Sequence, residues 1–217
     1  MQQENPSDEA LFDLPDDVRV PLRRIIVLAG ASGSGKSSIA HRLGVPVVRL
    51  DDFYLDHDHP GLPRRHGIID WDSPRTWDAD AAVAALLSAC RGDRLEIPTY
   101  DIPTSRRTGV ETIDISGMPA VLAEGIFAAQ IVEPLRDQGV LAGAFYLDQS
   151  RFTTALRRFA RDVGEARKPI PALVRRGTSL MLQEPSMVAG WRAGGLEALP
   201  TATAEERLRA LVTAPPA

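Results

Sequence analysis

The residues best suited to chemistry form the run Gly-Ala-Ser-Gly-Ser-Gly-Lys-Ser at positions 30–37. This run has the spacing G-x-x-x-x-G-K-[ST], which is typical of a loop that wraps phosphate groups. Its glycines let backbone N–H groups turn inward around phosphate oxygens, and a helix that begins there adds positive potential. We expect Lys36 to reach the β- and γ-phosphates of a nucleoside triphosphate and the Ser37 hydroxyl to bind Mg²⁺. The residues expected to hold the triphosphate are Gly30, Ala31, Ser32, Gly33, Ser34, Gly35, Lys36, Ser37 and Ser38.

Lysine is rare in this chain, and one of its lysines belongs to that loop. Of the 25 basic residues, only Lys36 and Lys168 are lysine. A compact ammonium fits inside a backbone loop, whereas the larger planar guanidinium of arginine does not. The lysine at position 36 therefore favours phosphate binding over a merely flexible glycine turn.

Two acidic residues each follow an apolar run that predicts a buried strand. Asp51 comes after residues 45–50, and Glu124 comes after residues 119–123. The carboxyl ends of strands line the crevice where α/β proteins bind ligands. There, Asp51 can orient an acceptor hydroxyl, take its proton and contact Mg²⁺ through water, while Glu124 can hold Mg²⁺ or its water shell. The alternatives are helix capping by Asp51 and a surface position for Glu124.

A strongly basic stretch spans residues 151–176, with eight basic and two acidic side chains. Arginines on a lid can stabilise the negative charge that spreads over a phosphoryl group during transfer, although a solvated helix face is the common alternative. The basic residues are Arg151, Arg157, Arg158, Arg161, Arg167, Lys168, Arg175 and Arg176.

The phosphate loop alone leaves three classes open: a small-molecule kinase, a GTPase switch, and a mechanical or transport ATPase. Neither lysine is followed by an acid two positions later, so the guanine-reading N-K-x-D element is absent. No transporter signature is visible, and 217 residues leave little room for motor machinery. Elimination favours the kinase.

Further motifs follow the phosphate loop in a fixed order. They are Asp51-x-Phe53-Tyr54, Asp72-Ser73-Pro74-x-x-Trp77-Asp78, Pro98-x-Tyr100-Asp101, Arg107, Glu124-Gly125-Ile126 and Arg157-Arg158-x-x-Arg161-Asp162. With this ordered set, residues 24–168 resemble the uridine kinase family of the phosphoribulokinase/uridine kinase group. The resemblance implies an enzyme that uses ATP and Mg²⁺ to phosphorylate a primary hydroxyl, most plausibly the 5′-hydroxyl of uridine or cytidine.

The resemblance also implies roles for individual residues. Asp51 is expected to be the catalytic base, assisted by Lys36 and Arg161. Side chains on the acceptor side are Asp51, Tyr54, Asp72, Tyr100, Arg107 and Arg158. Besides the loop, the side chains expected to contact the ATP phosphates are Arg161, Arg167 and Lys168. The side chains expected to bind the metal are Ser37, Asp51 and Glu124.

Three departures from the family pattern keep other acceptors open. Ser73 and Ser105 stand where the family has histidines, and the lid reads Glu-Ala-Arg-Lys at residues 165–168. Another nucleoside, a phosphosugar or a pantothenate-like alcohol remains an alternative acceptor. A catalytically weak nucleotide-binding regulatory protein is the alternative from another class.

These residues need a scaffold in which strands alternate with helices. Strands are predicted at residues 24–29, 45–50, 119–123 and 140–147, and helices at 37–43, 77–90, 128–136, 150–165, 172–190 and 204–213. Such alternation predicts a parallel sheet with helices on both faces. The expected fold is therefore an α/β, three-layer P-loop NTPase fold, nucleoside-kinase-like with a short lid. Residues 55–76 are predicted to form a long functional loop, and a further strand at 95–100 and a hairpin arm at 109–116 follow the helix at 77–90.

Length and composition set the remaining expectations. We predict a flexible acidic arm at residues 1–22, one kinase domain at 23–214 with a lid at about 164–172, and a frayed end at 215–217. A net charge of −4 argues against a nucleic-acid polymer as partner. No membrane-spanning run or secretory signal is visible, and the single cysteine excludes an internal disulfide, so a cytoplasmic location is expected. The expected partner is a small molecule, and a homo-oligomer is compatible with the sequence.

Overall fold

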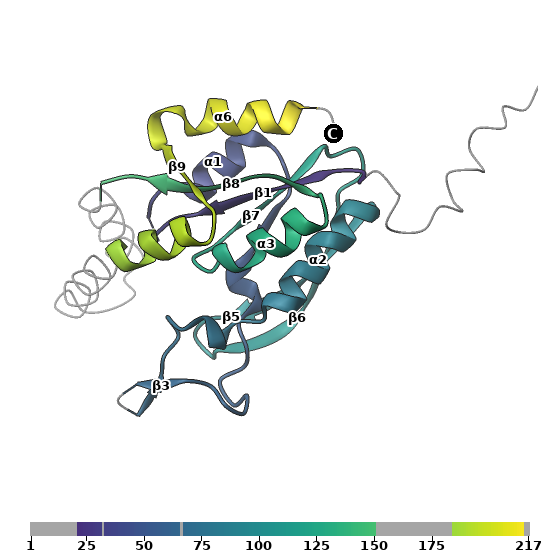
Figure 1. Cartoon of the computed structure of the whole chain (residues 1–217). Coiled ribbons are helices and arrows are strands. Elements are labelled where there is room, and N and C mark those ends of the chain that lie inside the picture. Colours follow the sequence, from purple (N-terminus) through teal and green to yellow (C-terminus); the bar gives the residue numbers. More distant parts are fainter. Residues whose placement is uncertain (1–20, 32, 66, 151–183, 215–217) are drawn as a thin grey trace, which may run out of the picture.

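A five-stranded parallel sheet forms the centre of the computed structural model, which describes residues 21–31, 33–65, 67–150 and 184–214 (Figure 1). The strand order is β2-β7-β1-β8-β9, and every neighbouring pair is parallel. The strands are β1 (Arg24–Ala29), β2 (Val47–Arg49), β7 (Ala120–Glu124), β8 (Leu141–Asp148) and β9 (Glu197–Pro200). The central strands are apolar apart from charged residues at their ends, as expected for strands whose two faces are both covered by helices.

Helices cover both faces of the sheet (Figure 1), and the helical residues 184–193 pack into the same core as α2 and α3. Helices α1 (Lys36–Leu43) and α6 (Thr201–Thr213) lie on one face, and α2 (Ala79–Arg91) and α3 (Ala129–Asp137) lie on the other. The side chains of β1 alternate between two cores: Ile26 and Leu28 pack with α1 and α6, while Ile25 and Val27 pack with α2 and α3. The predicted three-layer α/β fold is therefore confirmed.

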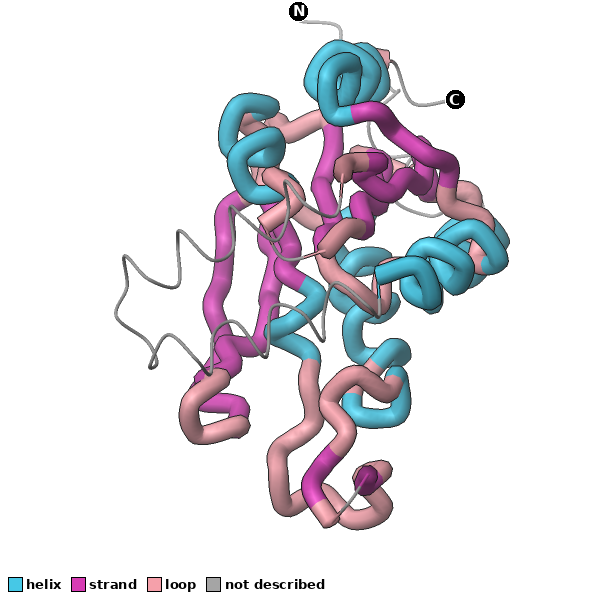
Figure 2. Tube along the Cα trace, turned by 90° about the vertical axis from the view of Figure 1, so that its left-hand side faces the viewer, coloured by secondary structure: helices cyan, strands magenta, loops and turns pink. Residues whose placement is uncertain are grey.

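A smaller antiparallel part projects from one end of the sheet (Figure 2). Strand β5 (Arg94–Asp101) pairs with β6 (Arg106–Asp114), and the two-residue strands β3 (Arg64–Arg65) and β4 (Ile68–Ile69) form a second small hairpin. Two short 3-10 helices, η2 (Leu50–Phe53) and η3 (Pro74–Thr76), connect this part to the sheet. The Nε1–H group of Trp77 donates to the backbone oxygen of Leu50 at 2.5 Å, which fixes η2 against the start of α2.

The predicted elements are found, with shifted boundaries. Strand β2 ends at Arg49 because the chain turns into η2 at Leu50, and α2 begins at Ala79 because the Asp78 side chain caps it by accepting from Ala81 N at 3.0 Å. Strand β9 was not predicted. The helix predicted at 204–213 already begins at Thr201.

Several predictions concern residues outside the described ranges. These are most of the acidic arm, the helix at 150–165, the lid at about 164–172, residues 172–183 of the helix predicted at 172–190 and the frayed end at 215–217. Residues 184–190 of the helix predicted at 172–190 are described and are helical. Within the described ranges, no helix has the length and apolar character needed to cross a membrane.

Candidate active site

The loop between β1 and α1 has the backbone shape that its glycines predict. Gly33 and Gly35 adopt positive φ angles of 86° and 99°, a region that favours glycine. Close packing inside the loop excludes a side chain at Gly30, where an added Cβ would lie 2.7 Å from Ser34 Oγ. Lys36 lies across the loop, and its Nζ donates to the backbone oxygens of Gly30 at 2.7 Å and Ala31 at 3.2 Å. The ammonium is thus held at the loop's centre.

Ser37 and Glu124 meet below the loop. The hydroxyl of Ser37 donates to Glu124 Oε1 at 3.1 Å, and the Glu124 side chain is only 8 % exposed. Its second oxygen, Oε2, is buried and has no hydrogen-bond partner among the described residues. A buried carboxylate oxygen without a donor is costly unless a cation or its bound water occupies the position. The pair therefore fits a Mg²⁺ site, and Glu124 is not the surface acid of the alternative interpretation.

Asp51 stands in η2, at the end of β2, on the pocket side of the sheet. No side chain caps η2, so capping is not the role of this acid. Its carboxylate reaches the water of the open pocket, yet surrounding protein atoms desolvate it and raise its pKa. Lys36 lowers this pKa, whereas Glu124 and Asp52 raise it further. Asp51 is thus electrostatically coupled to both the lysine and the carboxylate of the phosphate site.

Gly125 explains how η2 comes so close to the end of β7. An added Cβ at Gly125 would lie 2.7 Å from the Cβ of Leu50, so a side chain there would push η2 away. The glycine after Glu124 therefore lets the helix η2 that carries Asp51 approach the end of β7 and the candidate metal site.

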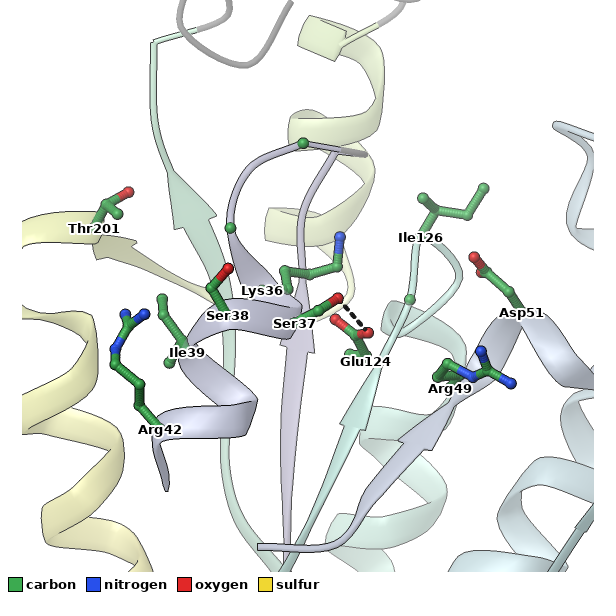
Figure 3. A pocket seen from close by; sticks show the side chains of 13 residues that line it. Lys36, Ser37, Ser38, Ile39, Arg42, Arg49, Asp51, Glu124, Ile126 and Thr201 are labelled. Atoms are coloured by element: carbon green, nitrogen blue, oxygen red, sulfur yellow. Dashed lines mark hydrogen bonds between the residues drawn. The ribbon is translucent and has the colours of Figure 1, made fainter. Parts of the chain in front are cut away.

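One open pocket of about 820 Å³ joins these groups (Figure 3). In this view, Asp51 and Arg49 lie on one side, Arg42 and Thr201 on the other, and Lys36 between them. The pocket is lined by Gly33, Gly35, Lys36, Ser37, Ser38, Ile39, Arg42, Arg49, Asp51, Glu124, Gly125, Ile126 and Thr201. An elongated ligand can therefore run from the α1–α6 side across the loop to Asp51.

An aromatic group centred on Tyr54 lies next to Asp51. The Tyr54 ring is 5.7 Å from the ring of Trp71, 5.8 Å from that of Tyr100 and 5.7 Å from that of Phe127, measured between centroids. Burial raises the pKa of Tyr54, and the charges of Asp51 and Asp72 raise it further. The structure therefore brings Tyr54, Tyr100 and Asp72 together beside the proposed base.

Two predicted acceptor residues also make contacts that hold the site together. Tyr100 donates its hydroxyl to the backbone oxygen of Leu55 at 3.1 Å. Arg107 donates to the backbone oxygens of Tyr54 and Phe53 at 3.2 and 3.3 Å and pairs with Asp78 at 3.2 Å. Arg107 thus ties β6 to η2 and to the start of α2, and its contact with a substrate stays a prediction.

Some predicted site residues lie outside the described ranges, and some residues that line the pocket were not predicted from the sequence. Ser32, Arg158, Arg161, Arg167 and Lys168 lie outside the described residues, so their roles stay predictions. The sequence interpretation missed the lining residues Ile39, Arg42, Arg49 and Thr201. Arg49 could have been found because it lies near the end of a predicted strand, two residues before Asp51. Arg42 and Thr201 come together only through the packing of α1 against α6.

Comparisons with known proteins agree with this geometry. Residues 25–170 match the model of the Phosphoribulokinase / Uridine kinase family. The uridine kinase of Staphylococcus aureus strain Newman is 29% identical over 164 residues, which cover 72% of this chain and 77% of that protein.

Solved structures share the fold. A candidate fructose transport system kinase from Silicibacter sp. TM1040 is 22% identical with a TM-score of 0.59, and the match covers 88% of this chain and 95% of that one. YFH7 from Saccharomyces cerevisiae, described as a candidate P-loop kinase with a circular permutation, is 12% identical with a TM-score of 0.57, covering 85% and 95%.

Proposed function

Because the chain belongs to the phosphoribulokinase/uridine kinase family and is thus a phosphotransferase with an alcohol acceptor, we propose that it phosphorylates the 5′-hydroxyl of uridine or cytidine with Mg·ATP. The observation that carries this proposal is the position of Asp51. Its carboxylate shares a pocket with Lys36 on one side and adjoins the Tyr54 aromatic group on the other.

In the proposed reaction, Asp51 orients the acceptor hydroxyl and takes its proton as the oxygen attacks the γ-phosphorus. The bond from that phosphorus to the bridging oxygen of ADP breaks, and ADP leaves. Burial raises the pKa of Asp51, which makes it a stronger base than an exposed aspartate. Lys36 and the backbone N–H groups of the loop stabilise charge on the phosphate oxygens.

Ser37 and Glu124 are proposed to hold Mg²⁺, which when bound would offset charge on the β- and γ-phosphates. The contact between these two side chains and the buried Glu124 oxygen support this assignment. Arg161, Arg167 and Lys168 are proposed to close over the phosphates, and Arg158 to approach the acceptor.

A pyrimidine nucleoside suits the side chains beside Asp51. Flat rings such as those of Tyr54 and Tyr100 offer surfaces for a nucleobase, and a carboxylate such as Asp72 can accept hydrogen bonds from ribose hydroxyls. The uridine kinases among the relatives support the same choice. With such a substrate, we propose a cytoplasmic enzyme of nucleoside salvage.

A panel assay tests the proposal. The protein is incubated with Mg·ATP and, in turn, uridine, cytidine, adenosine, thymidine, fructose, a phosphosugar and pantothenate, while ADP release is followed and products are identified by mass spectrometry. We expect the highest kcat/KM with uridine or cytidine, and a 5′-monophosphate as product. A higher kcat/KM with a sugar or pantothenate would refute the nucleoside assignment. No acceptor-dependent ADP release with any alcohol would instead favour a nucleotide-binding regulatory protein.

A further inference from the structure

Arg49 is a pocket residue that the reaction described above does not use. It is the last residue of β2, it is paired in register with Glu124 on β7, and it precedes Asp51 by two positions. Neighbouring strands lie only about 4.8 Å apart, so Arg49 starts from directly beside the proposed metal site. Its side chain is 63 % exposed and lines the pocket on the same side as Asp51 (Figure 3).

The charges at this end of the pocket need a cation. Asp51 and Glu124 both carry carboxylates, and a γ-phosphoryl group that arrives near them adds further negative charge. Among the described residues that line the pocket, the basic ones are Lys36, Arg42 and Arg49. Arg42 lies on the opposite side and bonds Glu205 at 2.6 Å (Figure 3). Of the described pocket residues, Arg49 is therefore the arginine on the same side as Asp51.

A buried acid holds Arg49 in place. Its Nε donates to Asp52 Oδ2 at 3.0 Å, and the Asp52 side chain is only 8 % exposed. Burial raises the pKa of Asp52, while Arg49 and the backbone of Tyr100 in β5 lower it. Because the bond to Asp52 uses Nε, it leaves the two terminal nitrogens of this exposed side chain able to donate to phosphate oxygens.

We infer that Arg49 contacts the phosphoryl group during transfer and offsets the charge that Asp51 and Glu124 place around it, with Asp52 as its positioning residue. This inference rests on the proposed kinase reaction. A guanidinium can give two parallel N–H bonds to a phosphoryl group, and such bonds strengthen as charge spreads over its oxygens. Arg49 exchanges neither protons nor electrons: the proton goes to Asp51 and the leaving oxygen to ADP.

Titrations with Mg·ADP, with and without aluminium fluoride, test this role. Aluminium fluoride with ADP imitates the transferring phosphoryl group, so the wild-type protein should bind the combination more tightly than Mg·ADP alone. In Arg49→Ala, the affinity for Mg·ADP with aluminium fluoride should fall by about 10²–10³-fold, while the Kd for Mg·ADP alone changes by less than about threefold. Arg49→Lys should keep part of the gain because it retains the charge without the planar fork.

Arg42→Ala is the matched control, since Arg42 is also a half-exposed arginine of the same pocket with a carboxylate partner. Arg42→Ala should reduce the affinity for Mg·ADP and the affinity for Mg·ADP with aluminium fluoride by the same factor. Because Arg49→Ala leaves the buried Asp52 unpaired, Arg49→Ala/Asp52→Asn provides a second variant that avoids an uncompensated buried charge.

The inference is overturned if the fluoride-dependent gain in affinity persists in Arg49→Ala and in Arg49→Ala/Asp52→Asn. It is also overturned if Arg42→Ala removes the gain equally, or if the wild-type protein shows no gain. The titrations are run without an acceptor and with each alcohol of the panel. A failure of uridine as acceptor would refute the proposed substrate while leaving this comparison of arginines intact.

Discussion

The phosphate end and the acceptor end of the pocket are built in different ways. At the phosphate end, eight consecutive residues supply the phosphate loop, its lysine and the hydroxyl proposed to bind Mg²⁺, and the contacts are largely made by the backbone. The acceptor end combines η2, the loop after it, the β5–β6 hairpin and the start of α3, and its side chains bond mainly to one another and to the backbone. Phosphate chemistry is thus fixed locally, whereas acceptor choice depends on tertiary packing.

The largest effect should come from the phosphate end. Lys36→Ala removes the ammonium that lies across the loop, and turnover should fall by about 10³-fold or more because this charge faces the transferring group. Circular dichroism and thermal unfolding serve as controls that the variant is folded. If Lys36→Ala keeps its turnover, the proposed role of the phosphate end in phosphoryl transfer is wrong.

The proposed metal site lies between the two ends of the pocket, and its loss should reduce activity nearly as much as the loss of Lys36. Glu124→Gln keeps the shape of the side chain but removes the charge that faces Ser37. We expect the Mg²⁺ concentration for half-maximal activity to rise by about tenfold or more, with turnover reduced at saturation. An unchanged Mg²⁺ dependence would show that Glu124 has another role.

A variant of the acceptor end should act on only one substrate. Arg107→Ala removes the bonds that tie β6 to η2, so the acceptor KM should rise by about tenfold while the KM for Mg·ATP stays within about twofold. Arg106→Ala is the control, because its neighbouring pair with Asp58 is exposed on both sides and worth little. Equal changes in both KM values would mean that the two ends are not separable in this way.

The smallest effect concerns stability. Because burial raises the folded-state pKa of Asp51 above its usual value of 3.8, the folded protein binds this proton more tightly than the unfolded chain does. Stability is therefore lost as pH rises from below 3.8 through the raised pKa, and the charged form is a cost at neutral pH. Asp51→Asn should raise the Tm at pH 7 by up to about 4 °C, with a smaller difference near pH 4. A lower Tm at pH 7 would contradict this electrostatic account.

The phosphate end was predictable from sequence because its signal is contiguous. The phosphate loop directly follows an apolar strand and directly precedes a helix that begins at Lys36. Asp51 and Glu124 could be identified because each follows an apolar run that predicts a strand. Strand β9 was not predictable, since Glu-Ala-Leu-Pro has no apolar run and is defined by pairing with β8.

The pocket walls could be predicted only in part. Arg42 and Thr201 are 159 positions apart and share a wall because α1 packs against α6. The aromatic group likewise depends on which rings the fold brings to Tyr54, and Phe127 carried no sequence signal for this position. A site built from consecutive residues can be predicted from the sequence, whereas contacts between elements far apart in the chain are known only once the fold is known.

Asp51→Asn tests the central claim most directly, because it removes the proposed base and preserves the side-chain shape. Binding of Mg·ATP is measured by titration, and acceptor-dependent ADP release is measured on the same preparation with the best alcohol of the panel. Asp51→Asn should bind Mg·ATP with near wild-type affinity and turn over about 10²–10⁴-fold more slowly. Turnover close to the wild-type rate would contradict the account.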